Sequence, residues 1–146
     1  ELGKRENTID RSSITVLVAE DSGYILKIIV NNLTKAGYKV VTASNGQMAL
    51  DHLTSLINDK DFKAIQNHVN IVISDIEMPQ MDGLHLIKNI KNNEKLKKLP
   101  CVVFSSLVNS EMALKCKSVG ADAQISKPEL ARLVEIVDGI ALSAQR

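Results

Sequence analysis

The chain has 146 residues, of which 45% are hydrophobic and 24% are charged, and its formal net charge is +1. This balance gives no reason to expect attraction to nucleic acid or to a membrane surface, and no apolar stretch approaches the ~20 residues of a membrane span. The length predicts one domain whose core needs no metal or disulfide to fold. Because the two cysteines form no disulfide framework and no secretory signal is visible, we expect a cytoplasmic location.

The first residues differ in character from the rest of the chain. Residues 1–13 are polar, mixed in charge and without periodicity, which predicts a linker or tail ahead of one domain at residues 14–146. The chain starts at Glu1 and not at Met. We therefore expect it to be the downstream piece of a longer protein.

From residue 14 onwards, short apolar runs alternate with stretches of helical periodicity. In chain order, we expect strand Ile14–Ala19, a helix from Ser22 to the cap Gly37, strand Lys39–Ala43, a helix after the turn Asn45-Gly46, strand Asn70–Ser74, a helix from Leu84, strand Cys101–Phe104, helix Ser110–Val119, strand Ala123–Ile125 and a helix opened by Pro128. The segment Asp59–His68 has weak periodicity and is either an extension of the second helix or a surface insertion. Alternation of this kind predicts an α/β fold, with a parallel sheet covered by helices on both faces.

Three acidic residues stand where two of the predicted strands end. Glu20 and Asp21 follow the first strand, and Asp75 follows the third. The carboxyl ends of strands in an open parallel sheet meet at one edge, and ligands bind there. If these strands are neighbours, their carboxylates repel one another unless a hard cation lies between them. The sequence therefore predicts a Mg²⁺ site, with one aspartate available for further chemistry.

Hydroxyl groups and a lysine are predicted to reach the same edge. Ser105 and Ser106 follow the fourth strand, and Lys127 follows the fifth. Mg²⁺ would neutralise two oxygens of a phosphoryl group, Lys127 would neutralise another, and a serine hydroxyl would donate a hydrogen bond. Carboxylates also serve as nucleophiles in enzymes that form aspartyl phosphate. We therefore expect Asp75 to accept a phosphoryl group.

These residues, in this order, resemble the receiver domain of two-component signalling, over about residues 14–146. Four strings carry the resemblance: Leu17-Val18-Ala19-Glu20-Asp21-Ser22, Ile73-Ser74-Asp75-Ile76-Glu77-Met78-Pro79-Gln80-Met81-Asp82-Gly83, Phe104-Ser105-Ser106, and Gly120-Ala121-Asp122-Ala123 leading to Lys127-Pro128. The resemblance implies a doubly wound, five-stranded sheet of the flavodoxin-like or CheY-like type, with strand order 2-1-3-4-5. It also implies that a histidine kinase phosphorylates Asp75 and that the interaction surface of the domain changes in response.

The resemblance assigns the ligands of the metal residue by residue. Asp21 and Asp75 would bind Mg²⁺ directly, and Glu20 would bind it through water. The backbone carbonyl of Glu77 would complete the protein ligands. Catalysis would be limited to the phosphoryl transfer of the domain itself and slow autodephosphorylation, so we do not expect an enzyme.

Further roles follow from the same resemblance. Ser105 would be the switch hydroxyl, and Lys127 would contact the phosphoryl group. We expect a cis bond before Pro128, because the lysine must turn back toward the edge of the sheet and cis costs only ~0.5–1 kcal/mol before proline. Glu77 and Leu107 would flank the path of attacking water, and apolar Leu107 is expected to slow the loss of the phosphoryl group.

A narrower resemblance is to the receiver half of CheV-type chemotaxis coupling proteins. It is carried by the strings Phe104-Ser105-Ser106, Gly120-Ala121-Asp122-Ala123-Gln124 and Ser126-Lys127-Pro128-Glu129. Such proteins join an N-terminal CheW-like domain to a C-terminal receiver. The resemblance therefore implies a CheA-like histidine kinase, an upstream CheW-like domain and chemoreceptor complexes as partners.

Two positions depart from the usual receiver pattern. Gln124 stands where many receivers have an aromatic residue that turns inward on activation, and Glu129 stands where Phe is frequent.

The alternatives to a chemotaxis receiver are a receiver of another response regulator, a flavodoxin-like cofactor binder, and a phosphohydrolase with an aspartate nucleophile. Glu20 and Asp21 would repel the phosphate of a flavin cofactor, and a phosphohydrolase would need a general acid near Asp75 and a cap domain.

Overall fold

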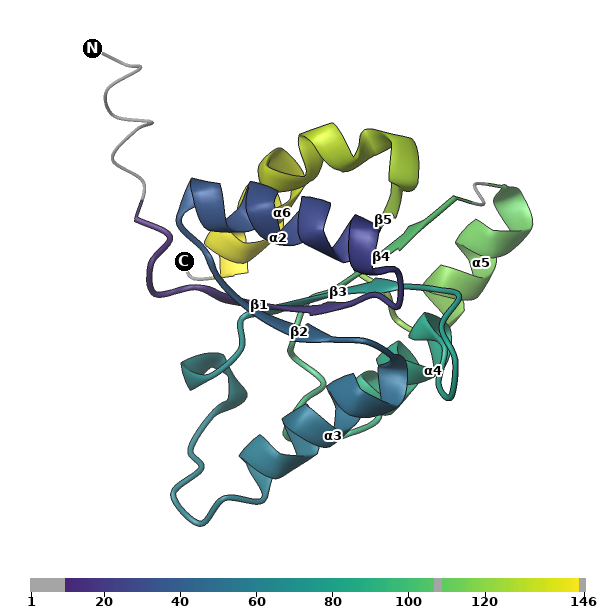
Figure 1. Cartoon of the computed structure of the whole chain (residues 1–146). Coiled ribbons are helices and arrows are strands. Elements are labelled where there is room, and N and C mark those ends of the chain that lie inside the picture. Colours follow the sequence, from purple (N-terminus) through teal and green to yellow (C-terminus); the bar gives the residue numbers. More distant parts are fainter. Residues whose placement is uncertain (1–9, 107–108, 145–146) are drawn as a thin grey trace.

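The computed structural model describes residues 10–106 and 109–144, without the side chains of residues 128–130 and 143–144. Strands and helices alternate along this part of the chain (Figure 1). The elements are β1 Thr15–Ala19, α2 Gly23–Ala36, β2 Lys39–Ala43, α3 Gly46–Ile57, the 3₁₀ helix η1 Ile65–Asn67, β3 Ile71–Asp75, α4 Gly83–Lys91, β4 Cys101–Ser105, α5 Ser110–Ser118, β5 Ala123–Ser126, the 3₁₀ helix η2 Lys127–Arg132 and α6 Leu133–Ala144.

The strands form one five-stranded parallel sheet in the order β2-β1-β3-β4-β5. This is the predicted order, and it places β1 beside β3, so that the acidic residues after them meet. Figure 1 shows α2 and α6 on one face of the sheet and α3, α4 and α5 on the other. The prediction of a doubly wound α/β fold is therefore confirmed.

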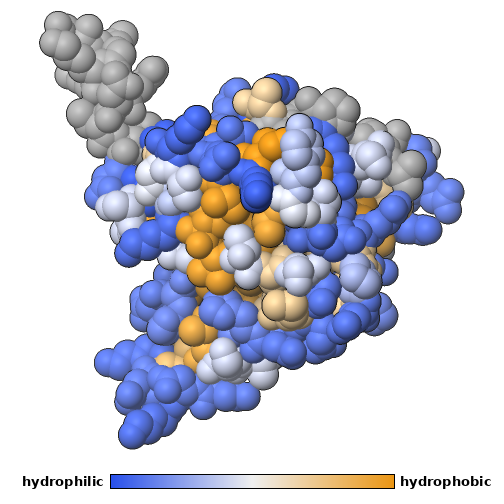
Figure 2. All heavy atoms as spheres, viewed as in Figure 1, coloured by the Kyte–Doolittle hydropathy of each residue, from blue (hydrophilic) through white to orange (hydrophobic). Residues whose placement is uncertain are grey.

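Each face of the sheet has its own apolar core, because successive strand residues point to opposite sides. On β1, Val16 and Val18 pack with the core under α2 and α6, whereas Leu17 packs with the core under α3 and α4. The residues of β3 and β4 are buried throughout, as parallel strands covered on both faces must be. On the edge strand β2, Val40 and Val41 are only half-buried, and Figure 2 shows apolar side chains between α2 and α3 in this region.

Polar caps set the start of the helices at the carboxyl edge of the sheet. The side chains of Ser22, Asn45, Asp82 and Asn109 each accept a hydrogen bond from a backbone N–H in the first turn of α2, α3, α4 and α5. At the other end of α2, Gly37 has φ 107°, which confirms the predicted left-handed cap. None of the helices in the described ranges is long and apolar enough to span a membrane.

Two predicted segments take a form that the sequence pattern left open or assigned differently. The segment Asp59–His68 is not an extension of α3 but an insertion that contains η1 and buries Ile65. The sequence predicts the last helix from Pro128, but the α-helix begins at Leu133, because η2 occupies residues 127–132. The tighter 3₁₀ helix connects β5 to α6 directly, since Lys127 follows the last residue of β5.

The chain ahead of β1 is tied to α6 by Arg11. The Arg11 guanidinium donates to both carboxylate oxygens of Asp138, at 2.9 Å from Nε and 2.7 Å from Nη2, and its Nη1 donates to the carbonyl of Ala36 at 3.2 Å. The hydroxyl of Tyr38 donates to the same carboxylate. We call Arg11, Ala36, Tyr38 and Asp138 the Arg11 clasp. It lies at the amino edge of the sheet, because Tyr38 directly precedes β2.

Replacing Asp138 by asparagine is expected to lower the free energy of unfolding by about 1–3 kcal/mol near neutral pH. The hydrogen bonds from Arg11, followed by those from Tyr38, hold the pKa of Asp138 below its ordinary value. Because the folded pKa is depressed, the carboxylate stabilises the fold above the unfolded pKa of about 3.9. This stabilisation is lost as the pH falls through the folded pKa.

Urea titrations of both proteins, at neutral pH and at an acidic pH below the folded pKa of Asp138, would measure this effect. The difference between wild type and Asp138→Asn should shrink at acidic pH, because the other carboxylates are common to both proteins. An equal difference at both pH values would show that the charge of Asp138 does not stabilise the fold.

Candidate functional site

Three carboxylates gather at the carboxyl edge of the sheet, as the sequence predicts. Glu20 and Asp21 follow β1, and Asp75 is the last residue of β3. One carboxylate oxygen from each of the three lies within 4.8 Å of the others. Glu20 and Asp75 are buried, whereas Asp21 is exposed. The site is therefore open to solvent on the side of Asp21 and closed by the protein on the other side.

Hydrogen bonds fix the two buried carboxylates. Oδ1 of Asp75 accepts from the backbone N–H of Ile76 at 2.8 Å, and Oε2 of Glu20 accepts from the N–H of Ser22 at 3.1 Å. Oε1 of Glu20 is buried and has no hydrogen-bond partner among the described residues. A buried oxygen without a donor is costly unless another positive group satisfies it.

Charge repulsion and burial act together on Glu20. Burial and the neighbouring carboxylates of Asp21 and Asp75 together raise the pKa of Glu20 to about 7, against the hydrogen bond from Ser22, which lowers it. Carboxylate oxygens are the preferred ligands of hard divalent cations, and such a cation would relieve both the repulsion and the unsatisfied oxygen. The three residues therefore fit a divalent metal site.

Lys127 extends into the same site from the start of η2. Its Nζ lies 3.5 Å from Oε1 of Glu20 and 3.4 Å from Oδ2 of Asp75. The ammonium group also lies 5.7 Å from the centre of the Phe104 ring, which is within the range of about 6 Å over which cation–π attraction acts. Lys127 is thus a point charge directed at the oxygens where a phosphoryl group on Asp75 would sit.

The remaining predicted residues are placed less completely. Ser105 ends β4 and is buried, whereas Ser106 is exposed, which favours Ser105 of the two hydroxyls. Its role as the switch residue stays a prediction. Glu77 is exposed in the loop after β3, and its carbonyl stays a predicted ligand. Leu107 lies outside the described residues.

The residues after Lys127 are described only in part. The cis bond expected before Pro128 has no support, because no cis peptide bond is found in the described part of the chain. The side chains of Pro128 and Glu129 lie outside that part. The effect of Glu129 therefore stays a prediction.

Two glycines let the loop after β3 pack closely against its neighbours, which the sequence pattern does not reveal. A Cβ atom on Gly83 would lie 2.0 Å from the backbone oxygen of Asp75, and one on Gly46 would lie 2.3 Å from the backbone oxygen of Met81. The N–H of Gly83 donates to the carbonyl of Ile76 at 2.8 Å. The Asp82-Gly83 pair, which looks like turn chemistry in the sequence, is thus the start of α4 and packs against the phosphoacceptor candidate itself.

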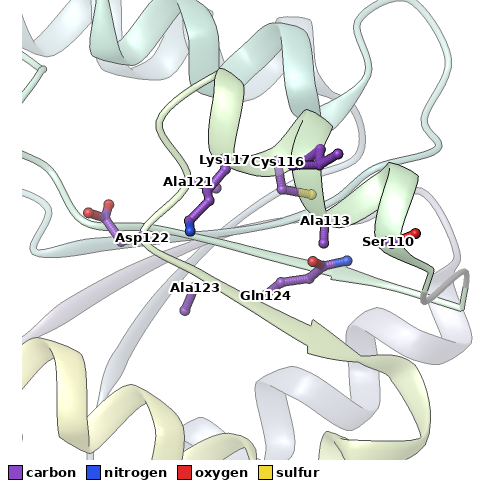
Figure 3. A pocket seen from close by; sticks show the side chains of 9 residues that line it. Ser110, Ala113, Cys116, Lys117, Ala121, Asp122, Ala123 and Gln124 are labelled. Carbon is purple, nitrogen blue, oxygen red and sulfur yellow. The ribbon is translucent and has the colours of Figure 1, made fainter.

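A separate pocket of about 530 Å³ lies between α5 and β5. Gln124 and Cys116 are among its lining residues, and Figure 3 shows the side chain of Gln124 extending toward Ala113. The Nε2 atom of Gln124 is buried without a hydrogen-bond partner in the described residues. The position where many receivers have an aromatic residue is therefore occupied by an amide beside an open pocket.

Replacing Lys127 by alanine is expected to tighten Mg²⁺ binding by roughly threefold to tenfold, because a cation within 4 Å of two ligand carboxylates opposes a second cation. Titration calorimetry with Mg²⁺ measures the affinity. Lys98→Ala, which removes an exposed lysine in the segment before β4, is the matched control and should leave the affinity unchanged. A large loss of affinity in Lys127→Ala would show that the lysine holds the carboxylates in place.

Comparison with known families and sequences gives a consistent result. A family model described as the response regulator receiver domain matches residues 16–138. The chain is 36% identical over 116 residues to the chemotaxis protein CheV1 of Helicobacter pylori, covering 80% of this chain and 34% of that protein. It is 34% identical over 115 residues to the two-component response regulator ARR17 of Arabidopsis thaliana, covering 77% and 74%. The chain therefore spans about a third of CheV1 but most of ARR17.

Solved structures show the same architecture. The chemotaxis protein CheY4 of Vibrio cholerae superposes with a TM-score of 0.74 at 26% identity, covering 87% of this chain and 98% of that one. The signal receiver domain of a histidine kinase from Syntrophus aciditrophicus gives a TM-score of 0.76 at 25% identity, covering 90% and 92%. The likeness extends over nearly the whole length of both structures.

Proposed function

Because the chain belongs to the response regulator receiver domain family, we propose that a histidine kinase transfers a phosphoryl group to Asp75 and that the interaction surface of the domain changes in response. A receiver domain is a signalling module and not a catalytic enzyme. The observation that carries the proposal is the cluster of Glu20, Asp21 and Asp75 with Lys127 between two of them. Membership of this family sets aside the flavodoxin-like and phosphohydrolase alternatives.

The transfer step needs a nucleophile and a neutralised phosphoryl group. A carboxylate oxygen of Asp75 attacks the phosphorus, and the bond from phosphorus to the donor nitrogen of the kinase histidine breaks. The imidazole keeps the electron pair and takes up a proton. Bound Mg²⁺ would supply positive charge to the phosphoryl oxygens, and Asp21, Asp75, the carbonyl of Glu77 and, through water, Glu20 would hold it.

Two further residues would connect phosphorylation to a change in shape. Lys127 would contact the phosphoryl oxygens, so Lys127→Ala would be phosphorylated without completing the change. Ser105 would donate its hydroxyl to the phosphoryl group, and it pairs in register with Ser126 on β5. A displacement of Ser105 would therefore reach the strand that carries Gln124 and one wall of the pocket between α5 and β5. Glu77 and Leu107 would set the lifetime of the aspartyl phosphate.

The narrower proposal is a role in chemotaxis, in the cytoplasm. Its support is the similarity to CheV1, and to CheV3 of the same organism at 30% identity, of which the chain spans 34% and 40%. On this proposal the kinase is CheA-like, a CheW-like domain lies upstream, and the whole protein works in chemoreceptor complexes. The chain is similarly related to a plant response regulator, at 34% identity to ARR17. The alternative is therefore that this domain is the receiver of a response regulator outside chemotaxis.

The phosphorylation proposal has a direct test. Incubation with acetyl phosphate and Mg²⁺ should add one phosphoryl group to each chain, measured by intact mass. Addition of a chelator should prevent the mass gain, because the three carboxylates then have no cation between them. Labelling that proceeds equally well with chelator would overturn the assignment of the metal site.

A further inference from the structure

The Arg11 clasp makes part of the expected tail a component of the folded domain. Arg11 lies within residues 1–13, which the sequence predicts to be a linker, yet only 17% of its side chain is exposed. It makes a bidentate ion pair with Asp138, and its guanidinium lies 5.8 Å from the centre of the Tyr38 ring. Bidentate pairs of this kind have a fixed geometry and resist reorientation.

The backbone next to Arg11 is held as well. The carbonyl of Arg11 accepts from the N–H of Ile14, and the carbonyl of Ile14 accepts from the N–H of Lys39 at the start of β2, each at 3.0 Å. The direction in which the chain approaches β1 is therefore determined by both side-chain and backbone contacts.

The contact joins a residue ahead of the family match to residues within it. The family model matches residues 16–138, so Arg11 lies ahead of the matched residues and Asp138 is the last of them.

Both partners of the ion pair are connected by short elements to the phosphoryl site. From Arg11 the chain runs through β1 to Glu20, and from Lys127 it runs through η2 into α6, which carries Asp138. Lys127 lies 3.4 Å from Asp75. Phosphorylation would replace the single negative charge of the Asp75 carboxylate by the about −1.5 to −2 charges of a phosphoryl group, so it would draw the ammonium group of Lys127 and shift the start of η2.

We propose that the Arg11 clasp transmits this shift: it couples α6 to the chain ahead of β1, so that phosphorylation changes the position of residues 10–14. The inference rests on the proposed phosphorylation of Asp75. Because of the clasp, the chain ahead of β1 would move together with the domain, whereas a flexible tether would move independently of the domain. The ion pair is the rigid link: Arg11 precedes β1, which ends at the site, and Asp138 lies on α6, which follows η2.

The test is a comparison of backbone amides by NMR, before and after addition of acetyl phosphate and Mg²⁺. In the wild type, residues 10–14 should have order parameters of about 0.85, and in Arg11→Ala these should fall below about 0.6. Phosphorylation should shift the amide signals of residues 10–14 in the wild type but not in Arg11→Ala or Asp138→Asn. The signal of Lys127 should shift in all three proteins.

Lys35→Ala is the matched control, because it removes an exposed cation from the last turn of α2 without touching the clasp. It should behave as the wild type in both measurements. Tail-like order parameters for residues 10–14 in the wild type would overturn the proposal. So would shifts of equal size in the wild type and Arg11→Ala, or no shift at residues 10–14 while Lys127 responds. Absence of any mass gain on Asp75 would instead overturn the proposed function, and with it this inference.

Discussion

Substitution of Asp75 by asparagine is expected to abolish phosphorylation, with labelling by acetyl phosphate reduced at least about a thousandfold, as when other nucleophiles are removed. The amide of asparagine does not attack phosphorus as the carboxylate does. Asparagine and aspartate have nearly the same volume, so the packing around position 75 should not change. The oxygen of the amide still accepts the hydrogen bond from Ile76, which Oδ1 of Asp75 accepts at 2.8 Å in the wild type. Loss of labelling would therefore report lost chemistry and not a lost fold.

The same substitution is expected to leave the fold at least as stable when no Mg²⁺ is present. Three carboxylates within 4.8 Å repel one another, and Asp75→Asn removes one of the charges. Urea unfolding in the presence of chelator measures this difference. A variant that lost both labelling and stability would indicate that Asp75 has a structural role.

Asp82→Asn is the matched control for Asp75→Asn, because it makes the same change of aspartate to asparagine at a position close by in the chain. Asp82 is exposed, and its side chain caps α4 by accepting from the N–H of His85 at 2.8 Å. Asparagine caps helices about as well as aspartate, so this variant should fold and be labelled as the wild type. Equal labelling of Asp75→Asn and Asp82→Asn would show that the phosphoryl group is bound elsewhere.

Substitution of Gly83 by alanine is expected to destabilise the protein by at least about 3 kcal/mol, the upper range of overpacking effects. The added methyl group would lie 2.0 Å from the backbone oxygen of Asp75 and 3.0 Å from Oγ of Ser74. Neither the strand nor the first turn of α4 moves away easily, because the N–H of Gly83 is bound to the carbonyl of Ile76. The backbone of Asp75 would shift, so labelling by acetyl phosphate should fall as well.

Gly139→Ala is the control, because a Cβ atom at that position meets nothing within 4 Å. Gly139 is an exposed residue inside α6, where alanine is favoured over glycine by about 0.5–1 kcal/mol. Urea titration should therefore show opposite changes for the two substitutions. If Gly83→Ala were within about 1 kcal/mol of the wild type, the loop after β3 would be less tightly packed than the structure shows.

The alternation of strands and helices, and the edge of the sheet at which the acidic residues lie, could be predicted from the sequence. Apolar runs such as Ile71–Ser74 are local patterns, and their length and β-branched residues are sufficient to identify a buried strand. The carboxyl edge of a parallel sheet then follows from the chain direction, and the strand order implied by the resemblance, with β1 beside β3, brings Glu20, Asp21 and Asp75 together. The pattern also identified Lys127, because it follows a strand in the same way.

The contacts between distant parts of the chain could not be predicted in this way. Arg11 and Asp138 are separated by 127 positions, and nothing in a polar segment distinguishes an arginine that will be bound from one that stays in solvent. In the same way, Gly83 looks like a turn residue until the backbone of Asp75 is found against it. Such contacts depend on the relative placement of whole elements, which side-chain periodicity does not encode. The sequence therefore predicted which residues could carry the chemistry, and the packing decided which residues hold them in place.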